Sequence, residues 1–120
     1  MVVEPSASKK LRLQAIRHLV GFPPHVIRPS DGHAYYVEGH AAEITTADSQ
    51  NDGAASALIV LENGKALGPP HRAHADIVAT GGGQFSHWSD GKKSVVYFSS
   101  SDNSDPRTNG RVYQVVVLIW

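Results

Sequence analysis

Cysteine is absent from this chain of 120 residues. Its absence excludes disulfide bonds, thiolate metal sites and cysteine nucleophiles, and cysteine usage therefore indicates no redox compartment. The chain also lacks an excess of either charge, since 11 basic residues balance 11 acidic ones. Without a positive excess there is no electrostatic basis for binding nucleic acid or an anionic membrane, so neither is expected as a partner.

Long hydrophobic runs are missing too. No apolar stretch reaches the length of a membrane span, and the first residues lack the apolar core of a signal peptide. We therefore expect a soluble protein that acts in the cytoplasm. The hydrophobic share of 41% and the charged share of 18% are typical of a globular protein. The length predicts one domain over residues 1–120 with a single core and flexible residues 1–7.

The N-terminal region has a helical pattern. Leu13, Ile16 and Val20 recur at the spacing of one face of an α-helix. Ser8 can cap the first turn, and Gly21 can end the last one. The sequence therefore predicts an amphipathic helix over residues 8–20.

Residues 33–120 have the pattern of β-structure instead. Short apolar runs between turn residues predict strands at 34–37, 42–45, 57–61, 84–88, 94–99 and 112–120. Asn63-Gly64 and Asp90-Gly91 are hairpin signals, because glycine and asparagine tolerate the positive φ of tight turns. A short helix is possible over 71–79. We predict a mainly β fold: a small antiparallel sheet curled into a sandwich or partial barrel, with one N-terminal helix.

The polar loop from Ser99 to Gly110 is the first candidate binding site. It is longer than a hairpin needs, and loops of this length are often functional. Its hydroxyls, carboxylates and amides can hydrogen-bond a carbohydrate, and an arginine can pair with an anionic group on a ligand. The candidate ligand-binding residues are Asp102, Asn103, Asp105, Arg107, Asn109 and Arg111. The alternative is that the same side chains form Asx turns that fold the loop on itself.

Aromatic residues on two neighbouring predicted strands are the second candidate. The face of an exposed aromatic ring can stack against the C–H groups of a sugar. Trp88 and Tyr97 are the residues expected to do so. Period-two alternation places Ser86 and Trp88 on the strand face opposite Phe85 and His87, and only one of these faces can be fully core. Tryptophan is more often a core residue than a platform, so both roles stay open.

A histidine-rich segment is the third candidate. His71, His74, Asp76 and His87 offer imidazole and carboxylate groups for a divalent metal such as zinc or iron. On a helix, positions 71 and 74 would share one face. The spacing does not match HExxH, and no glutamate lies beside either histidine to act as a general base.

Part of the chain resembles a known type of sequence. The segment from Asn63 to Arg111, above all GPPHRAHADI, GGGQFSHW and YFSSSDNSDPRTNGR, is similar to an uncharacterised region appended to bacterial proteins that handle surface polysaccharides and glycans. There it stands near sugar-transferring or methyl-transferring domains. The resemblance implies a role linked to glycans, and it implies no catalytic residue.

These observations lead to one expectation and two alternatives. We expect a non-enzymatic β-rich module that binds a polar ligand, in the first place a carbohydrate, without a cofactor. The first alternative is a metal-dependent enzyme that uses the histidine cluster. The second is a structural or assembly domain of a larger protein, which self-associates by strand pairing through residues 112–120. A serine hydrolase is not expected, because no Gly-x-Ser-x-Gly motif is present.

Overall fold

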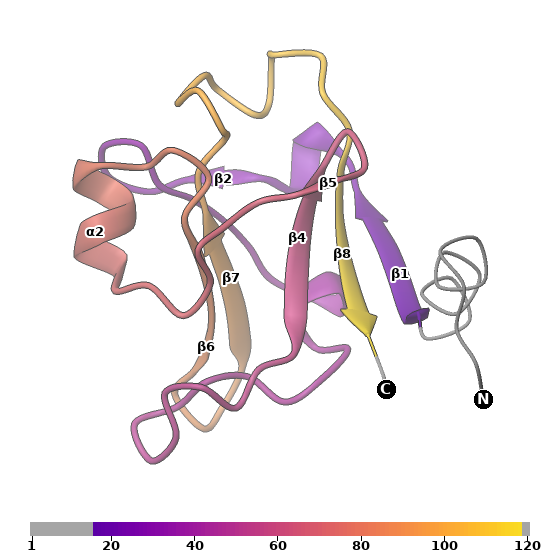
Figure 1. Ribbon diagram of the computed structural model, residues 1–120, viewed down its shortest axis with the longest axis vertical. Helices are drawn as coiled ribbons and strands as arrows, with labels where there is room; N and C mark the ends of the chain where they lie inside the picture. Colours follow the sequence, from indigo (N-terminus) through magenta and orange to yellow (C-terminus); the bar gives the residue numbers. More distant parts are fainter. Residues whose placement is uncertain (1–15, 119–120) are drawn as a thin grey trace, which may run out of the picture.

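The computed structural model describes residues 16–118 and shows two four-stranded antiparallel sheets that face each other (Figure 1). The first sheet has the order β1 (Ile16–Phe22), β8 (Tyr113–Leu118), β4 (Leu58–Glu62) and β5 (Lys65–Ala66). The second has the order β2 (Arg28–Pro29), β3 (Tyr35–Val37), β7 (Ser94–Phe98) and β6 (Phe85–Ser89). The helices are η1 (Pro24–Val26), η2 (His40–Ala42) and α2 (His74–Ala79). The predicted mainly β fold is confirmed, and the described strands form a sandwich without closing into a barrel.

The predicted helix over 8–20 is wrong for residues 16–20. These residues belong to β1, which pairs antiparallel with β8 in a register that matches Val20 to Val115. The apolar residues of this segment fit both a helical and an extended pattern, and pairing with the apolar β8 decided between them, as tertiary contacts often override local propensity. Residues 8–15 of the predicted helix, and the predicted flexible residues 1–7, lie outside the described part of the chain.

The predicted strand over 42–45 is also wrong. The chain leaves the second sheet after Val37, turns at Gly39 with a φ of 81°, and forms the 3-10 helix η2. Beyond it, single contacts replace a ladder: the Ala42 carbonyl accepts a hydrogen bond from His87, and Glu43 accepts one from the Ser94 N–H. Ala41 and Ala42 are buried in the core, so this stretch is apolar because it packs inward.

Both hairpin predictions and the short helix are confirmed. Asn63 and Gly64 have φ angles of 49° and 79°, the two positive values that a type I′ turn requires, and they join β4 to β5. At the second hairpin, which joins β6 to β7, the Asp90 carboxylate accepts the N–H groups of Lys92 and Lys93. Helix α2 lies within the predicted 71–79 segment and stands beside the second sheet (Figure 1).

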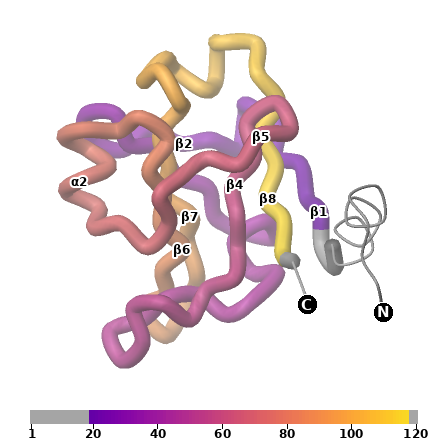
Figure 2. Tube along the Cα trace, in the orientation of Figure 1, coloured from indigo at the N-terminus to yellow at the C-terminus, as the bar shows by residue number. Residues whose placement is uncertain are grey.

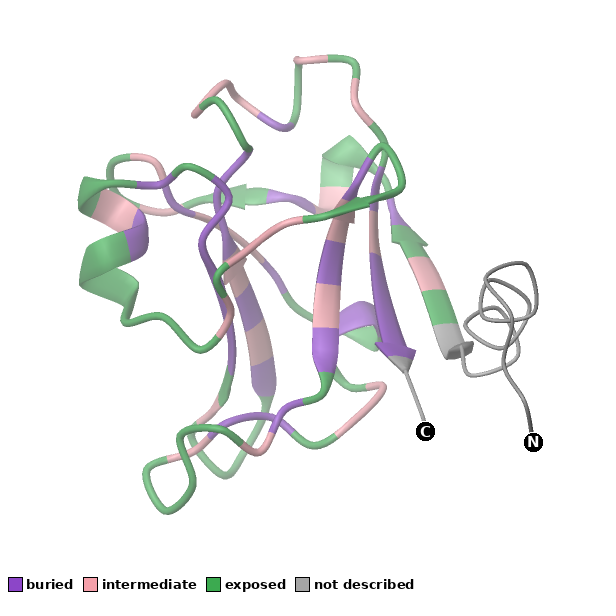
Figure 3. Ribbon diagram, in the orientation of Figure 1, coloured by how far each residue is buried: buried purple, intermediate pink, exposed green. Residues whose placement is uncertain are grey.

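The core lies between the two sheets and takes side chains from both. Alternate residues of β4 and β7 point into it, and Figure 3 shows this alternation of buried and partly exposed residues along β4. Phe22, Phe98 and Tyr113 form an aromatic centre, with ring centroids 5.7 Å apart for Phe22 and Phe98 and 5.4 Å for Phe98 and Tyr113. Burying each such side chain stabilises the fold by about 1.5–3 kcal/mol.

Strand β8 occupies a central position, as its apolar sequence predicts. Its described residues pair with β1 on one side and with β4 on the other. Self-association through this strand stays a prediction, and it would have to involve the outer strands β1 or β5, because both sides of β8 are already paired. None of the helices within residues 16–118 is long and apolar enough to cross a membrane.

Among residues 19–117, whose burial the structure describes, His87 is the one buried histidine, with 1% of its surface exposed. Its Nε2–H donates to the Ala42 carbonyl at 2.6 Å, so its Nδ1 accepts the Ser56 hydroxyl at 2.7 Å. The Ser56 oxygen accepts the Leu58 N–H in turn. Burial lowers the pKa of His87, although the Ala42 carbonyl and the charges of Asp48 and Glu43 act in the opposite direction. The site therefore suits a neutral imidazole.

This burial predicts acid destabilisation. Because the folded-state pKa lies below the unfolded value of about 6.5, the unfolded chain takes up the proton first. The contribution of His87 to the free energy of unfolding should stay constant above about pH 6.5. Below about pH 6.5 it should fall, by at most about 1.4 kcal/mol per pH unit. Urea unfolding at several pH values should show a smaller fall for His87→Gln. The exposed His25→Gln should keep the parent's pH dependence, and equal slopes for the parent and His87→Gln would contradict the assignment.

Candidate functional site

A cavity of about 510 Å³ lies on the outer face of the second sheet. Alternation along β6 and β7 turns Phe85, Val96 and Phe98 into the core and turns Trp88 and Tyr97 outward. Trp88 is 39% exposed, which resolves the choice between core and surface that its sequence left open. The cavity is lined by Asp48, Gly53, His71, Arg72, Ala73, His74, Ser86, Trp88 and Tyr97.

Strand β6 is an outer strand of its sheet (Figure 2), and two loops form hydrogen bonds with its free edge. Along one half of β6, the Asp48 N–H donates to the His87 carbonyl and the Ser89 N–H donates to the Asp48 carbonyl. Along the other half, the Phe85 N–H donates to the Pro69 carbonyl and the Arg72 N–H donates to the Phe85 carbonyl. The loops around 48 and 71, 23 residues apart in sequence, therefore meet beside one strand.

The closest contact between these loops joins Asp48 to His71. The Asp48 carboxylate is buried, with 3% of its side chain exposed, and its Oδ2 accepts the Nδ1–H of His71 at 2.6 Å. Its Oδ1 accepts the Ser56 N–H at 2.7 Å. His71 has a φ of 59°, an uncommon conformation for a residue other than glycine. The imidazole is thus held at the rim of the cavity by a buried carboxylate.

The remaining rim residues come from the start of α2. The ring of His74 stacks on Tyr97 with centroids 4.4 Å apart, and its Nε2 lies 3.0 Å from the Ser30 hydroxyl. The Arg72 Nε donates to Gln84 at 2.9 Å, which orients its guanidinium. The cavity therefore combines an aromatic floor with two imidazoles and one cation.

A second hollow of about 480 Å³ lies on the other side of Trp88 and Tyr97. It is lined by Ser30, Tyr36, Glu38, Trp88, Asp90, Lys93, Val95 and Tyr97. Lys93 and Glu38 form an exposed ion pair at 2.5 Å. Because Trp88 and Tyr97 belong to both hollows, their rings form a ridge that a ligand in either hollow would contact.

The four candidate metal ligands are not brought together. His71 contacts Asp48, His74 contacts Ser30, Asp76 pairs with Arg72 at 3.5 Å, and His87 is in the core. Helix α2 begins only at His74, so His71 lies outside it and the two histidines do not share a helical face. Within residues 16–118 no group of three or more His, Asp or Glu side chains is placed to hold a metal ion.

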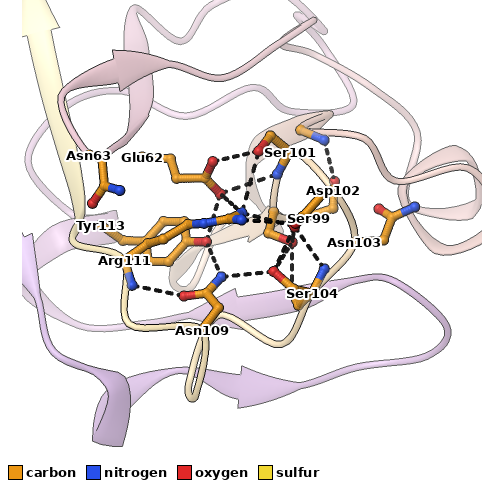
Figure 4. Close-up of polar contacts among 12 residues, drawn as sticks. Glu62, Asn63, Ser99, Ser101, Asp102, Asn103, Ser104, Asn109, Arg111 and Tyr113 are labelled. Atoms are coloured by element: carbon orange, nitrogen blue, oxygen red, sulfur yellow. Dashed lines mark hydrogen bonds and ion pairs between the residues drawn. The ribbon is translucent and has the colours of Figure 1, made fainter.

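The polar loop folds on itself (Figure 4). Asp102 accepts two hydrogen bonds from the Arg111 guanidinium, both at 2.8 Å, and further ones from the N–H and hydroxyl of Ser104. These contacts, those with Arg111 first, hold the pKa of Asp102 well below its usual range and raise the pKa of Arg111. Asp102 and Arg111, which the sequence made candidates for ligand binding, therefore pair with each other.

A buried carboxylate ties this loop to the first sheet. Glu62, at the end of β4, accepts the hydroxyls of Ser101 at 2.6 Å and Tyr113 at 2.7 Å (Figure 4). Burial alone would raise the pKa of Glu62, but these hydrogen bonds and the charge of Arg111 keep it below the ordinary value. Burial raises the pKa of Tyr113 to about 12. Asn109 donates to the Tyr113 oxygen at 2.9 Å and completes the network.

The last three loop candidates are also engaged internally. Asp105 accepts the Arg107 guanidinium at 2.7 Å, and that guanidinium lies 5.5 Å from the centre of the Tyr35 ring. Asn103 accepts the Gly82 N–H at 2.7 Å and donates to the Thr80 carbonyl at 3.2 Å. None of the six loop residues lines either hollow beside Trp88. The structure therefore shows the self-folded loop, and it separates the loop from the aromatic residues.

Sequence reasoning missed Asp48 and the cavity position of Arg72 and Ser86. Asp48 stands in TADSQNDG, a stretch typical of a solvated loop, and no local pattern marks a carboxylate that will be buried. Its partner His71 was noted only as a metal ligand. The single available signal was an eight-residue polar loop following a predicted strand, which is too common to identify a site.

No protein-family model matches the chain, and neither the curated proteins nor the solved structures contain a match to it.

The loop contacts predict that Asn103 stabilises the fold. Asn103→Ala removes the two hydrogen bonds to Gly82 and Thr80 and places alanine at a φ of 65°. We expect the free energy of unfolding to fall by about 1–3 kcal/mol in urea titrations. Asn51→Ala, at an exposed loop position, should change it by less than about 0.5 kcal/mol. Similar values for both variants would show that the Asn103 contacts contribute little.

Proposed function

We propose that the protein binds a carbohydrate on the ridge formed by Trp88 and Tyr97. The observation that carries the proposal is the exposed Trp88 side chain, which lies between two adjoining hollows on the outer face of a sheet. Aromatic rings at the surface of a concave site are suited to stack against the C–H face of a sugar. Binding needs no bond to be made or broken.

The position of Trp88 supports a binding role over a packing role. The core between the sheets is filled by other side chains of β6 and β7, and Trp88 points away from it. Among residues 19–117 only Leu19 and Val112 are other large apolar residues with comparable exposure, and neither lines these hollows. A large exposed aromatic residue inside a concavity is a feature that folding alone does not require.

The charges around the ridge favour a neutral ligand with many hydroxyl groups. One hollow has Arg72 and the His71–Asp48 pair, and the other has the Lys93–Glu38 pair. Both signs are present and mostly paired, so an ionic ligand would find no excess of opposite charge. Hydroxyl groups can donate to the carboxylates and accept from the cations.

The contacts differ from those that the sequence suggested. Trp88 and Tyr97 keep their predicted stacking role, whereas His71, Arg72 and His74 replace the loop residues as the polar partners. The resemblance of residues 63–111 to regions of glycan-handling proteins stays a prediction, because no comparison matched the chain. Neither of the two alternative functions is favoured by an observation among the described residues.

Replacing Trp88 should test the proposal. We expect Trp88→Ala to weaken sugar binding at least about tenfold, which corresponds to about 1.4 kcal/mol of lost stacking. Backbone amide NMR titration with pooled bacterial mono- and oligosaccharides, in the presence of a chelator, measures this affinity. The control is Leu19→Ala, which removes another exposed apolar side chain (52% exposed) from the first sheet and should bind like the parent.

The same titration can reject the proposal. Amide shifts should concentrate on residues 71–74, 86–88 and 97. Shifts confined to 102–111 would move binding to the loop, and no shifts at millimolar sugar would exclude carbohydrate as the ligand.

A further inference from the structure

The hydrogen-bonded pair of Asp48 and His71 has a geometry that sugar stacking does not need. We propose that His71 is a general base which, positioned by Asp48, activates water to hydrolyse a carboxylic ester in the 510 Å³ cavity. The substrate class, an acyl group carried on a sugar hydroxyl, rests on the proposed carbohydrate binding. The base itself follows from the pair alone.

The first step of the argument is the orientation of the imidazole. The buried Asp48 carboxylate accepts the Ser56 N–H through Oδ1 and the His71 Nδ1–H through Oδ2. In a neutral histidine this places the proton on Nδ1 and leaves the lone pair on Nε2, which is the atom available to take a proton. A carboxylate that fixes a histidine in this tautomer is the orienting part of general-base sites on many unrelated folds.

The second step is the backbone. His71 adopts a φ of 59°, which histidine tolerates at a cost in stability. Asparagine or glycine fits this conformation more easily, and asparagine could also donate a hydrogen bond to Asp48. Linking the two loops therefore does not require an imidazole. The imidazole adds a base at the wall of the cavity.

The third step is the surroundings of His71. Ser86 lines the same cavity and carries a hydroxyl group. Arg72 follows His71 directly and lines the same cavity, with its guanidinium oriented by Gln84. These two groups can donate hydrogen bonds to a carbonyl oxygen as it becomes negative. Trp88 and Tyr97 provide apolar surface for the rest of the substrate.

The reaction needs no group that the protein lacks. His71 Nε2 takes a proton from water as the water oxygen forms a bond to the ester carbonyl carbon. The tetrahedral intermediate then breaks its bond to the sugar oxygen, and the His71 imidazolium gives its proton to that oxygen. The products are a carboxylic acid and a free hydroxyl, and nothing is oxidised or reduced. Asp48 stays ionised and stabilises the transient imidazolium.

The decisive variant is His71→Asn. Asparagine tolerates the positive φ and can keep a hydrogen bond to Asp48, so the fold should persist while the base is lost. Hydrolysis of para-nitrophenyl acetate by the full chain should fall at least about tenfold. The matched control is His25→Gln, because His25 is an exposed histidine that does not line the cavity. Its rate should stay within about twofold of the parent.

Asp48 is tested as a positioning residue. Asp48→Asn keeps an oxygen for the Ser56 N–H but removes the negative charge. The rate constant should fall several-fold with little change in KM, and nitrogen NMR shifts should show that His71 no longer favours the Nδ1–H tautomer. A purely structural role for Asp48 would leave that tautomer signature unchanged in the folded variant. If this variant does not fold, the comparison of His71→Asn with His25→Gln decides.

Three outcomes would overturn the proposal: no hydrolysis above buffer, full activity in folded His71→Asn, or an equal loss in His71→Asn and His25→Gln. A fully acetylated methyl glucoside tests the substrate class, since the parent should release acetate from it and His71→Asn should not. If the parent hydrolyses para-nitrophenyl acetate but releases no acetate from the glucoside, a sugar ester is excluded as the substrate class. Sugar binding is measured by the amide titration and hydrolysis by the para-nitrophenyl acetate assay, so the two proposals fail separately.

Discussion

The open edge of β6 is the constraint on which the candidate site depends. A strand at the outer position of a sheet exposes N–H and C=O groups that need partners. In this protein two loops supply them, one from before β4 and one from after β5, and each covers half of the strand. Because both loops form hydrogen bonds with the same edge, Asp48 and His71 lie next to each other. A requirement of backbone hydrogen bonding thus brings about the hydrogen bond between Asp48 and His71.

Strand β6 also connects the core to the surface. Its alternation sends Phe85 and His87 inward and Trp88 outward, so movement of the strand would disturb packing and cavity together. His87 is linked through Ser56 to the segment that holds Asp48, since the Ser56 hydroxyl bonds His87 and the Ser56 N–H bonds Asp48. A neutral buried histidine and a buried carboxylate therefore share one supporting residue.

The polar loop after β7 shows how a residue composition suited to binding can serve stability instead. Its carboxylates have their charges neutralised by Arg107 and Arg111, and its turns are closed by their own side chains. The buried Glu62 accepts the hydroxyls that anchor the loop to the first sheet. A group that must be buried with a charge needs several donors, and the loop provides them. The composition is explained without a ligand.

The sequence by itself determined the local features of this protein. Short apolar runs between turn residues predicted β4, β6 and β7, and Asn63-Gly64 predicted its hairpin, because these depend on neighbours in the chain. Only the tertiary structure decided that residues 16–20 pair as a strand, that residues 42–45 do not, and that Asp48 meets His71. Those outcomes depend on which distant backbone or carboxylate lies within hydrogen-bonding distance. Local patterns in the sequence do not determine that distance, because the folded sheet sets it.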